Sequence, residues 1–75
     1  MKLKAGDKIR IRRDISSNKS YPGVGINIDM FQYRGRVATI KKVVDNKYYD
    51  IDINVWAWSD DMVDLITKGD SYKIF

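Results

Sequence analysis

The sequence contains no cysteine, no histidine and a single proline. Without cysteine, the chain cannot form a disulfide framework or a cysteine-based zinc site, so its stability must come from an apolar core. Without histidine, it lacks the side chain most often used as a general base and as a metal ligand. No ordinary catalytic triad or thiol nucleophile can be assembled from this set of residues. We therefore expect a protein that is not an enzyme and that uses no cofactor and no metal.

Glutamate is also absent, and all ten acidic residues are Asp. Asp favours turns and caps over helix interiors, which indicates a chain of strands and turns. The acids at positions 50, 52, 60 and 61 do not have the spacing of a calcium loop, so we interpret them as exposed strand and turn residues. The chain begins without the apolar core of a signal peptide, and no apolar run has the length of a membrane span. We expect a cytoplasmic protein with neither a membrane partner nor a small-molecule substrate.

The charges along the 75 residues are unevenly distributed. Residues 1–13 and 34–49 are two basic blocks, whereas residues 50–66 contain five Asp and no basic residue. Such a distribution suits a polyanion on one side of the molecule and a basic partner on the other. Solvated strand faces on one small domain explain the same pattern equally well.

The first half of the chain predicts one strand followed by a long loop. Charged and apolar residues alternate over residues 8–12, which is the period of a half-buried strand. Residues 14–28 are rich in Ser, Asn and Gly and predict a long loop, with a turn at residues 21–23. Asp29 is expected to cap one helical turn over residues 30–33, which Gly35 ends.

The middle of the chain predicts a hairpin. A strand is expected over residues 36–44, with a bulge near residues 41–42 that returns apolar side chains to the core. The Asp-Asn pair at residues 45–46 is expected to form a hairpin turn. The next strand then places the apolar residues at positions 49, 51 and 53 on one face.

Two tryptophans mark the fourth predicted strand. Strict alternation puts Trp56 and Trp58 on one face; we expect Trp58 in the core and Trp56 either in the core or against a partner. A 3₁₀ turn is expected at residues 60–63 and a closing strand at residues 64–66. Residues 68–75 form a tail or an extra edge strand, so the predicted domain spans residues 1–67.

Three segments of this chain resemble one family of small barrels. They are Gly6-Asp7-Lys8-Ile9-Arg10-Ile11, Arg34-Gly35-Arg36-Val37-Ala38-Thr39-Ile40, and Tyr48-Tyr49-Asp50-Ile51-Asp52 with Trp56-Ala57-Trp58-Ser59-Asp60-Asp61-Met62. Over roughly residues 4–66, the chain is similar to small SH3-like proteins of Gram-positive bacteria and their phages. It is more distantly similar to the mind-bomb-type SH3 repeat.

The resemblance implies an all-β fold: a five-stranded SH3-like small barrel. Its long first loop carries one helical turn, and a 3₁₀ turn precedes the last strand. The resemblance also implies a phage or prophage accessory protein that binds a host protein, with inhibition of that protein as one outcome. Residues 14–28 contain only one acid, Asp14, so the acidic loop cluster of SH3 domains that bind proline-rich peptides is missing.

Our first hypothesis for function is binding of another protein. Small barrels have exposed edges and a groove beside the long loop, which can hold an extended segment by aromatic contact or by strand addition. The candidate binding residues are Tyr21, Tyr33, Tyr48 and Trp56. The competing interpretation is that Trp58 and one of the tyrosines belong to the core.

The alternative hypothesis is nucleic-acid binding through a basic strand face. Basic side chains that neutralise phosphates supply affinity that does not depend on sequence, and exposed aromatic rings can stack on bases. The candidate residues are Lys8, Arg10, Arg12, Arg34, Arg36, Lys41 and Lys42. The competing interpretation is a soluble barrel whose basic rim serves solubility and binds no nucleic acid.

Overall fold

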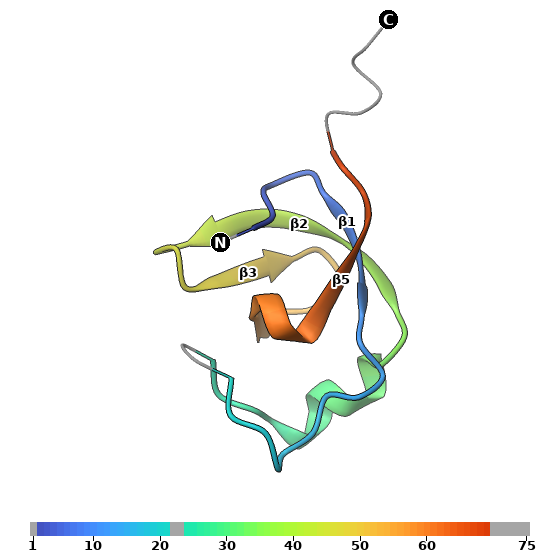
Figure 1. The fold of residues 1–75 in the computed structure, drawn as a ribbon, viewed down its shortest axis with the longest axis vertical. Helices are drawn as coiled ribbons and strands as arrows, with labels where there is room; N and C mark the ends of the chain where they lie inside the picture. The colour runs from blue at the N-terminus through green and yellow to red at the C-terminus, as the bar shows by residue number, and fades with distance from the viewer. Residues whose placement is uncertain (1, 22–23, 70–75) are drawn as a thin grey trace, which may run out of the picture.

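The chain folds as one antiparallel sheet, and the computed structural model describes residues 2–21 and 24–69. Five strands follow one another across the sheet in the order β4-β3-β2-β1-β5. Figure 1 labels β1, β2, β3 and β5. They are β1 (Lys8–Ile11), β2 (Val37–Val44), β3 (Tyr48–Ile51), β4 (Ala57–Trp58) and β5 (Val63–Thr67). The 3₁₀ helix η1 (Ile28–Tyr33) lies between β1 and β2, and the 3₁₀ helix η2 (Asp60–Met62) lies before β5. The predicted all-β class is confirmed.

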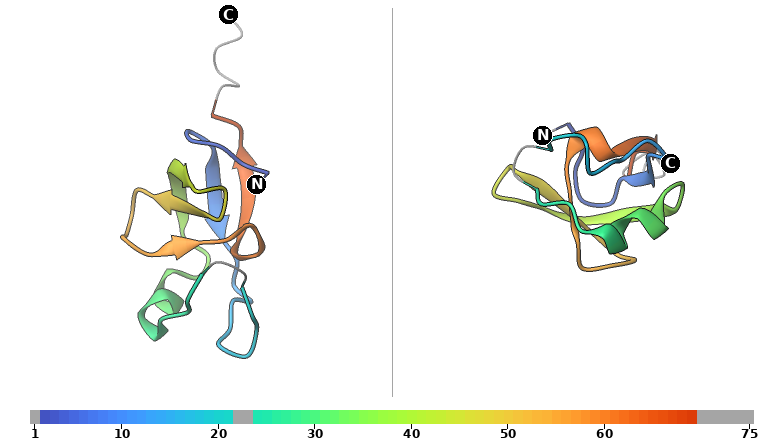
Figure 2. Two further views of the ribbon diagram at one scale, coloured as in Figure 1. Left: turned by 90° about the vertical axis from the view of Figure 1, so that its left-hand side faces the viewer. Right: turned by 90° about the horizontal axis from the view of Figure 1, so that it is seen from below.

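The longest strand, β2, belongs to both halves of the sheet. Its residues 37–39 pair with β1, whereas its residues 40–44 pair with β3. The β2–β3 register shifts between Ile40 and Lys42, which confirms the bulge predicted near residues 41–42. A bulge bends a strand and increases its twist. Accordingly, β1 and β5 run along the long axis in the left view of Figure 2, while β3 and β4 run across it.

The core is formed by side chains from all five strands and from the connections between them. Its buried apolar residues are Ile9, Ile11, Ile15, Tyr21, Met30, Ala38, Ile40, Tyr49, Ile51, Trp58, Met62 and Val63. The predicted burial of Ile9, Ile11, Tyr49 and Ile51 is therefore confirmed. The predicted core position of Trp58 is confirmed as well. The Trp58 indole Nε1 donates a hydrogen bond to Asn54 Oδ1 at 3.0 Å, so this buried ring satisfies its polar atom.

Two turns fix the geometry of the sheet. Asp45 and Asn46 have φ angles of 51° and 57°, which is the left-handed pair that a two-residue hairpin turn requires. The hairpin predicted at these residues is confirmed. Gly35 has a φ of 78°, and its N–H donates to the carbonyl of Ile11 at 2.7 Å. Gly35 thereby joins the end of η1 to the end of β1.

The cap predicted for the first helical turn is wrong. The turn begins earlier, and Asn27 is its N-cap: Asn27 Oδ1 accepts a hydrogen bond from the N–H of Asp29 at 2.9 Å. An N-cap needs an extended backbone and a side-chain oxygen within reach of the next turn, and Asn27 supplies both. The turn predicted at residues 21–23 and the edge strand predicted in residues 68–75 fall partly or wholly outside the described residues.

Candidate functional site

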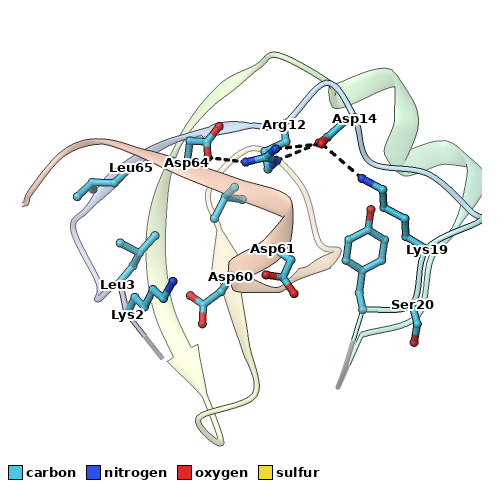
Figure 3. A pocket seen from close by; sticks show the side chains of 12 residues that line it. Lys2, Leu3, Arg12, Asp14, Lys19, Ser20, Asp60, Asp61, Asp64 and Leu65 are labelled. Carbon is cyan, nitrogen blue, oxygen red and sulfur yellow. Dashed lines mark hydrogen bonds and ion pairs between the residues drawn. The ribbon is translucent and has the colours of Figure 1, made fainter.

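A groove lies between the long first loop, η2 and the first described residues of the chain (Figure 3). Its volume is about 710 Å³, and we call it the charged groove. Its charged lining residues are Lys2, Arg12, Asp14, Lys19, Asp60, Asp61 and Asp64. Its other lining residues are Leu3, Ser20, Tyr21, Val63 and Leu65.

The floor of the charged groove belongs to the hydrophobic core. Tyr21 and Val63 are each 6% exposed and pack in the core cluster. The Tyr21 hydroxyl accepts a hydrogen bond from the N–H of Ser16 at 3.2 Å, which ties the loop back onto its own ring. Leu3 and Leu65 lie together at one end of the groove, while Asp14 and Lys19 lie at the other (Figure 3). Lys2 lies beside Leu3 at the first end, so the groove combines apolar and charged side chains over a buried floor.

The buried Tyr49 holds two walls of the groove together. Its side chain is fully buried, and its hydroxyl donates to the Asp60 carboxylate. The same hydroxyl accepts a hydrogen bond from the N–H of Leu3 at 3.0 Å. Burial and the hydrogen bond to Asp60 raise the pKa of Tyr49 to about 12, so the hydroxyl stays protonated at neutral pH. Tyr49 thus orients one carboxylate of the groove and anchors the start of the chain beside it.

Arg12 links the long loop to β5 across the rim. Its Nε and Nη2 each donate to the Asp14 carboxylate at 2.9 Å, and its Nη1 donates to Asp64 Oδ1 at 3.1 Å. The Arg12 hydrogen bonds hold the pKa of Asp14 well below its usual range, and the same contacts raise the pKa of Arg12. Lys19 adds a longer contact of 3.4 Å to Asp14. Asp14 and Asp64 are therefore neutralised within the molecule.

Two carboxylates of η2, Asp60 and Asp61, form no ion pair within the described part of the chain. Within the described residues, the one hydrogen bond that the Asp60 carboxylate accepts comes from the neutral Tyr49 hydroxyl. Asp61 is exposed and forms no ion pair within residues 2–21 and 24–69. Both side chains face the hollow in Figure 3. The groove can therefore attract a cation on its η2 side.

The aromatic residues predicted to bind a protein do not share this groove. Tyr21 is the one that lines it, and there it is buried as part of the floor. A small core needs such a ring, and Tyr21 presents only a small part of its surface to the groove. Tyr33 ends η1, Tyr48 begins β3 and Trp56 precedes β4, each of them half-buried and outside the groove. The groove beside the long loop is charged rather than aromatic.

The basic residues predicted to bind nucleic acid divide into three groups. Lys8 and Arg10 lie exposed on the outer face of β1, and Arg34 and Arg36 flank Gly35. Arg12 is engaged by two carboxylates. Lys41 and Lys42 lie at the bulge of β2, on the half of the sheet that pairs with β3, where Lys42 is opposite Asp50. The structure thus brings Arg10, Arg34 and Arg36 together and separates Lys41 and Lys42 from them along β2.

Sequence reasoning missed two features of these surfaces. Asp60 and Asp61 were interpreted as a simple 3₁₀ turn, although the acidic block at residues 50–66 indicated a basic partner in general terms. Arg13 was not a candidate, yet its side chain packs against Gly35 beside Arg34 and Arg36. Both features depend on contacts between distant segments, which residue spacing does not reveal.

Two further classes of site were sought in the described parts of the chain. Within residues 2–21 and 24–69, no group of three potential metal-ligating side chains is close enough to hold a metal ion. No helix in the same residues has the length and apolar character that crossing a bilayer requires. We also compared the chain with protein-family models, with curated proteins and with solved structures, and none of them matches it.

Proposed function

We propose that this protein is a non-enzymatic binding module, built as an SH3-like small barrel, that holds an extended basic segment of another protein in the charged groove. The architecture is supported by the strand order, by the bulged β2 shared between two halves, and by the placement of η2 before β5. The resemblance to phage-encoded SH3-like proteins extends this proposal to a bacterial host protein as the partner.

The observation that carries the proposal is the chemistry of the groove. Asp60 and Asp61 form no ion pair within residues 2–21 and 24–69, while Leu3 and Leu65 offer an apolar surface at the end of the groove where Lys2 also lies. A segment with Lys or Arg near an aliphatic residue matches both features. Charges on such a rim orient the segment, raise its association rate and add a modest share of the affinity, while Leu3 and Leu65 supply apolar burial.

The edge of the sheet gives this segment a backbone partner. β5 is the last strand in the sheet order, so one of its edges pairs with no strand in the described part of the chain. Val63, Asp64 and Leu65 of β5 also line the groove. An extended segment can add to such an edge by main-chain hydrogen bonds while its side chains enter the groove.

Selection from a random peptide display library tests this proposal. We expect enrichment of peptides with Lys or Arg next to an aliphatic residue. For the best peptide, the double variant Asp60→Asn/Asp61→Asn should bind about tenfold more weakly, because each exposed charge pair contributes up to ~1 kcal/mol. Asn at position 60 keeps an acceptor for the Tyr49 hydroxyl, which protects the fold.

Asp45→Asn is the matched control, since it removes one charge at a left-handed position that Asn also adopts. It should leave peptide affinity unchanged. Enrichment of acidic peptides, or equal affinity of the wild type and the double variant, would contradict the proposal.

A further inference from the structure

Four arginines lie at the junction of β1, η1 and β2, either in contact with Gly35 or next to it in the chain. Arg10 Nη1 donates a hydrogen bond to the carbonyl of Gly35 at 3.0 Å. A Cβ at Gly35 would lie 2.9 Å from Arg13 Nε, so the Arg13 side chain passes directly over this glycine. Arg34 and Arg36 are its neighbours in the chain. We call Arg10, Arg13, Arg34 and Arg36 the arginine cluster.

The backbone under the arginine cluster is fixed. The N–H of Gly35 donates to the carbonyl of Ile11 at 2.7 Å, and the N–H of Ile11 donates to the carbonyl of Arg36 at 2.8 Å. Gly35 also has a φ of 78°, a backbone conformation that residues with a side chain rarely adopt. The cluster therefore sits on a rigid connection rather than on a free loop.

Two of the guanidinium groups are oriented by aromatic rings. Arg34 Cζ lies 4.4 Å from the centre of the Phe31 ring, and its Nη2 donates to the carbonyl of Ile15 at 2.6 Å. Arg36 Cζ lies 5.8 Å from the centre of the Tyr33 ring. A cation over a ring face is stabilised there, and a guanidinium in this position still has N–H groups for an acceptor.

No carboxylate neutralises the cluster within residues 2–21 and 24–69. All four side chains belong to exposed residues, and none of them forms an ion pair in this part of the chain. A shallow hollow of about 360 Å³ borders the cluster, and its two acids are Asp14 and Asp64, which Arg12 already engages. Arg10 and Arg13 both lie against Gly35, where their like charges repel one another and a bound anion would relieve this repulsion.

We propose that the arginine cluster binds the phosphate backbone of a nucleic-acid duplex. Planar guanidinium groups pair with phosphate oxygens through two parallel hydrogen bonds, which makes Arg the preferred residue for this contact. Arg34 and Arg36 each cover one face of the half-buried rings of Phe31 and Tyr33, which reduces the ring surface for stacking on bases. Binding of single strands depends largely on such stacking, and its loss favours a duplex.

This site differs from the set that the sequence predicted. Arg13 joins it, Arg12 leaves it because of its two carboxylates, and Lys41 and Lys42 lie on the part of β2 that pairs with β3 rather than with β1. Lys8, exposed on the same face of β1 as Arg10, can extend the surface. None of the four cluster residues lines the charged groove, so the two proposals succeed or fail independently.

Fluorescence anisotropy with a labelled random-sequence DNA duplex, measured over a range of salt concentrations, tests the assignment. The key variant is Arg13→Gln/Arg36→Gln, which spares the two arginines that hydrogen-bond to the backbone. It should reduce the slope of log affinity against log salt by about two, since each lost phosphate contact removes ~0.9. Circular dichroism should show the same fold as the wild type.

Lys41→Gln/Lys42→Gln is the control with the same change in net charge, and its slope should match the wild type. Absence of duplex binding at low salt, or an equal loss of slope in both double variants, would overturn the proposal. Tighter binding of a single strand than of the duplex would also overturn the proposal. The same holds if a polyaspartate peptide of equal charge competes as well as DNA, because the surface would then bind acidic polymers in general.

Discussion

The charged groove and the arginine cluster lie on either side of two consecutive residues, Arg12 and Arg13. On the groove side, Arg12 meets Asp14 and Asp64 and closes the loop onto β5. On the cluster side, Arg13 packs on Gly35 and meets no carboxylate in the described part of the chain. These neighbouring arginines therefore have different roles. Arg12 joins two segments through ion pairs, and Arg13 adds positive charge to the surface.

The two regions also differ in what lies beneath them. The groove floor consists of core residues, with Tyr21 and Val63 buried and Tyr49 bonded to its wall. The cluster rests on half-buried rings at the end of η1. We therefore expect changes beneath the groove to reduce stability and changes in the cluster to reduce binding, and three measurements test this contrast.

The largest effect is expected from truncating the two tyrosines beneath these surfaces. Tyr21→Ala should lower the free energy of unfolding by about 3–5 kcal/mol, because a buried ring is lost from the core. Tyr33→Ala should lower it by only about 1 kcal/mol, since this ring is half-buried. Urea denaturation monitored by tryptophan fluorescence measures both values. If Tyr21→Ala fails to fold, Tyr21→Phe replaces it. Equal losses of unfolding free energy at positions 21 and 33 would contradict the expected difference between the two regions.

The second effect is a loss of stability in alkali through Tyr49. The unfolded tyrosine ionises near its ordinary pKa of 10.0, whereas the folded one stays protonated to about 12. The stabilisation is therefore fully present below pH 10 and falls as the pH rises towards 12. The two-unit shift corresponds to a loss of up to about 3 kcal/mol.

Tyr49→Phe is the control for this loss, because it cannot ionise. The difference between its unfolding free energy and that of the wild type should shrink steadily over this alkaline range. If the difference in unfolding free energy stayed constant with pH, the pKa of Tyr49 would not be raised by folding.

The smallest effect is expected from the adjacent arginines themselves. Arg12→Gln should destabilise the protein slightly at low salt and not at high salt, because its ion pairs are exposed. The pKa of Asp14 is lowered, so the stabilisation it contributes is present above the ordinary carboxylate pKa and is lost as the pH falls. Thermal unfolding of Arg12→Gln should consequently depend less on acid than that of the wild type.

Arg13→Gln removes the same charge one position along the chain and should leave thermal unfolding unchanged. If Arg13→Gln were the more destabilising of the two, the roles assigned to these neighbours would be reversed.

The sequence predicted the features that depend on near neighbours in the chain. Alternation at residues 8–12 placed Ile9 and Ile11 in the core, and the broken alternation of β2 predicted its bulge. The positive φ angles at residues 45–46 likewise follow from the residue types there. The first cap was missed because Asn27 and Asp29 are both good capping residues, and only the backbone angle at Asn27 decides between them.

The surfaces were less predictable, because they are made by segments that are far apart in the sequence. The contact of Arg12 with Asp64 joins residues 52 positions apart, and no local pattern indicates it. Tyr21 was a reasonable binding candidate in a loop, but the core of a small domain recruited its ring. In the same way, Arg13 became part of a cluster only because Gly35 brings η1 against the end of β1.

The pairing of β1 with β5 has a consequence for the order of folding. This pairing joins opposite ends of the domain, and the nearby hydrogen bond from the N–H of Gly69 to Asp7 Oδ1 spans 62 positions. The β2–β3 hairpin and its link to β4 are local, so we expect them to form before the slow closure of β1 onto β5. The groove requires β5, so a chain emerging from the ribosome should be unable to hold a partner there until its last strand has been synthesised. Refolding followed by stopped-flow fluorescence should therefore show peptide binding only in the final kinetic phase.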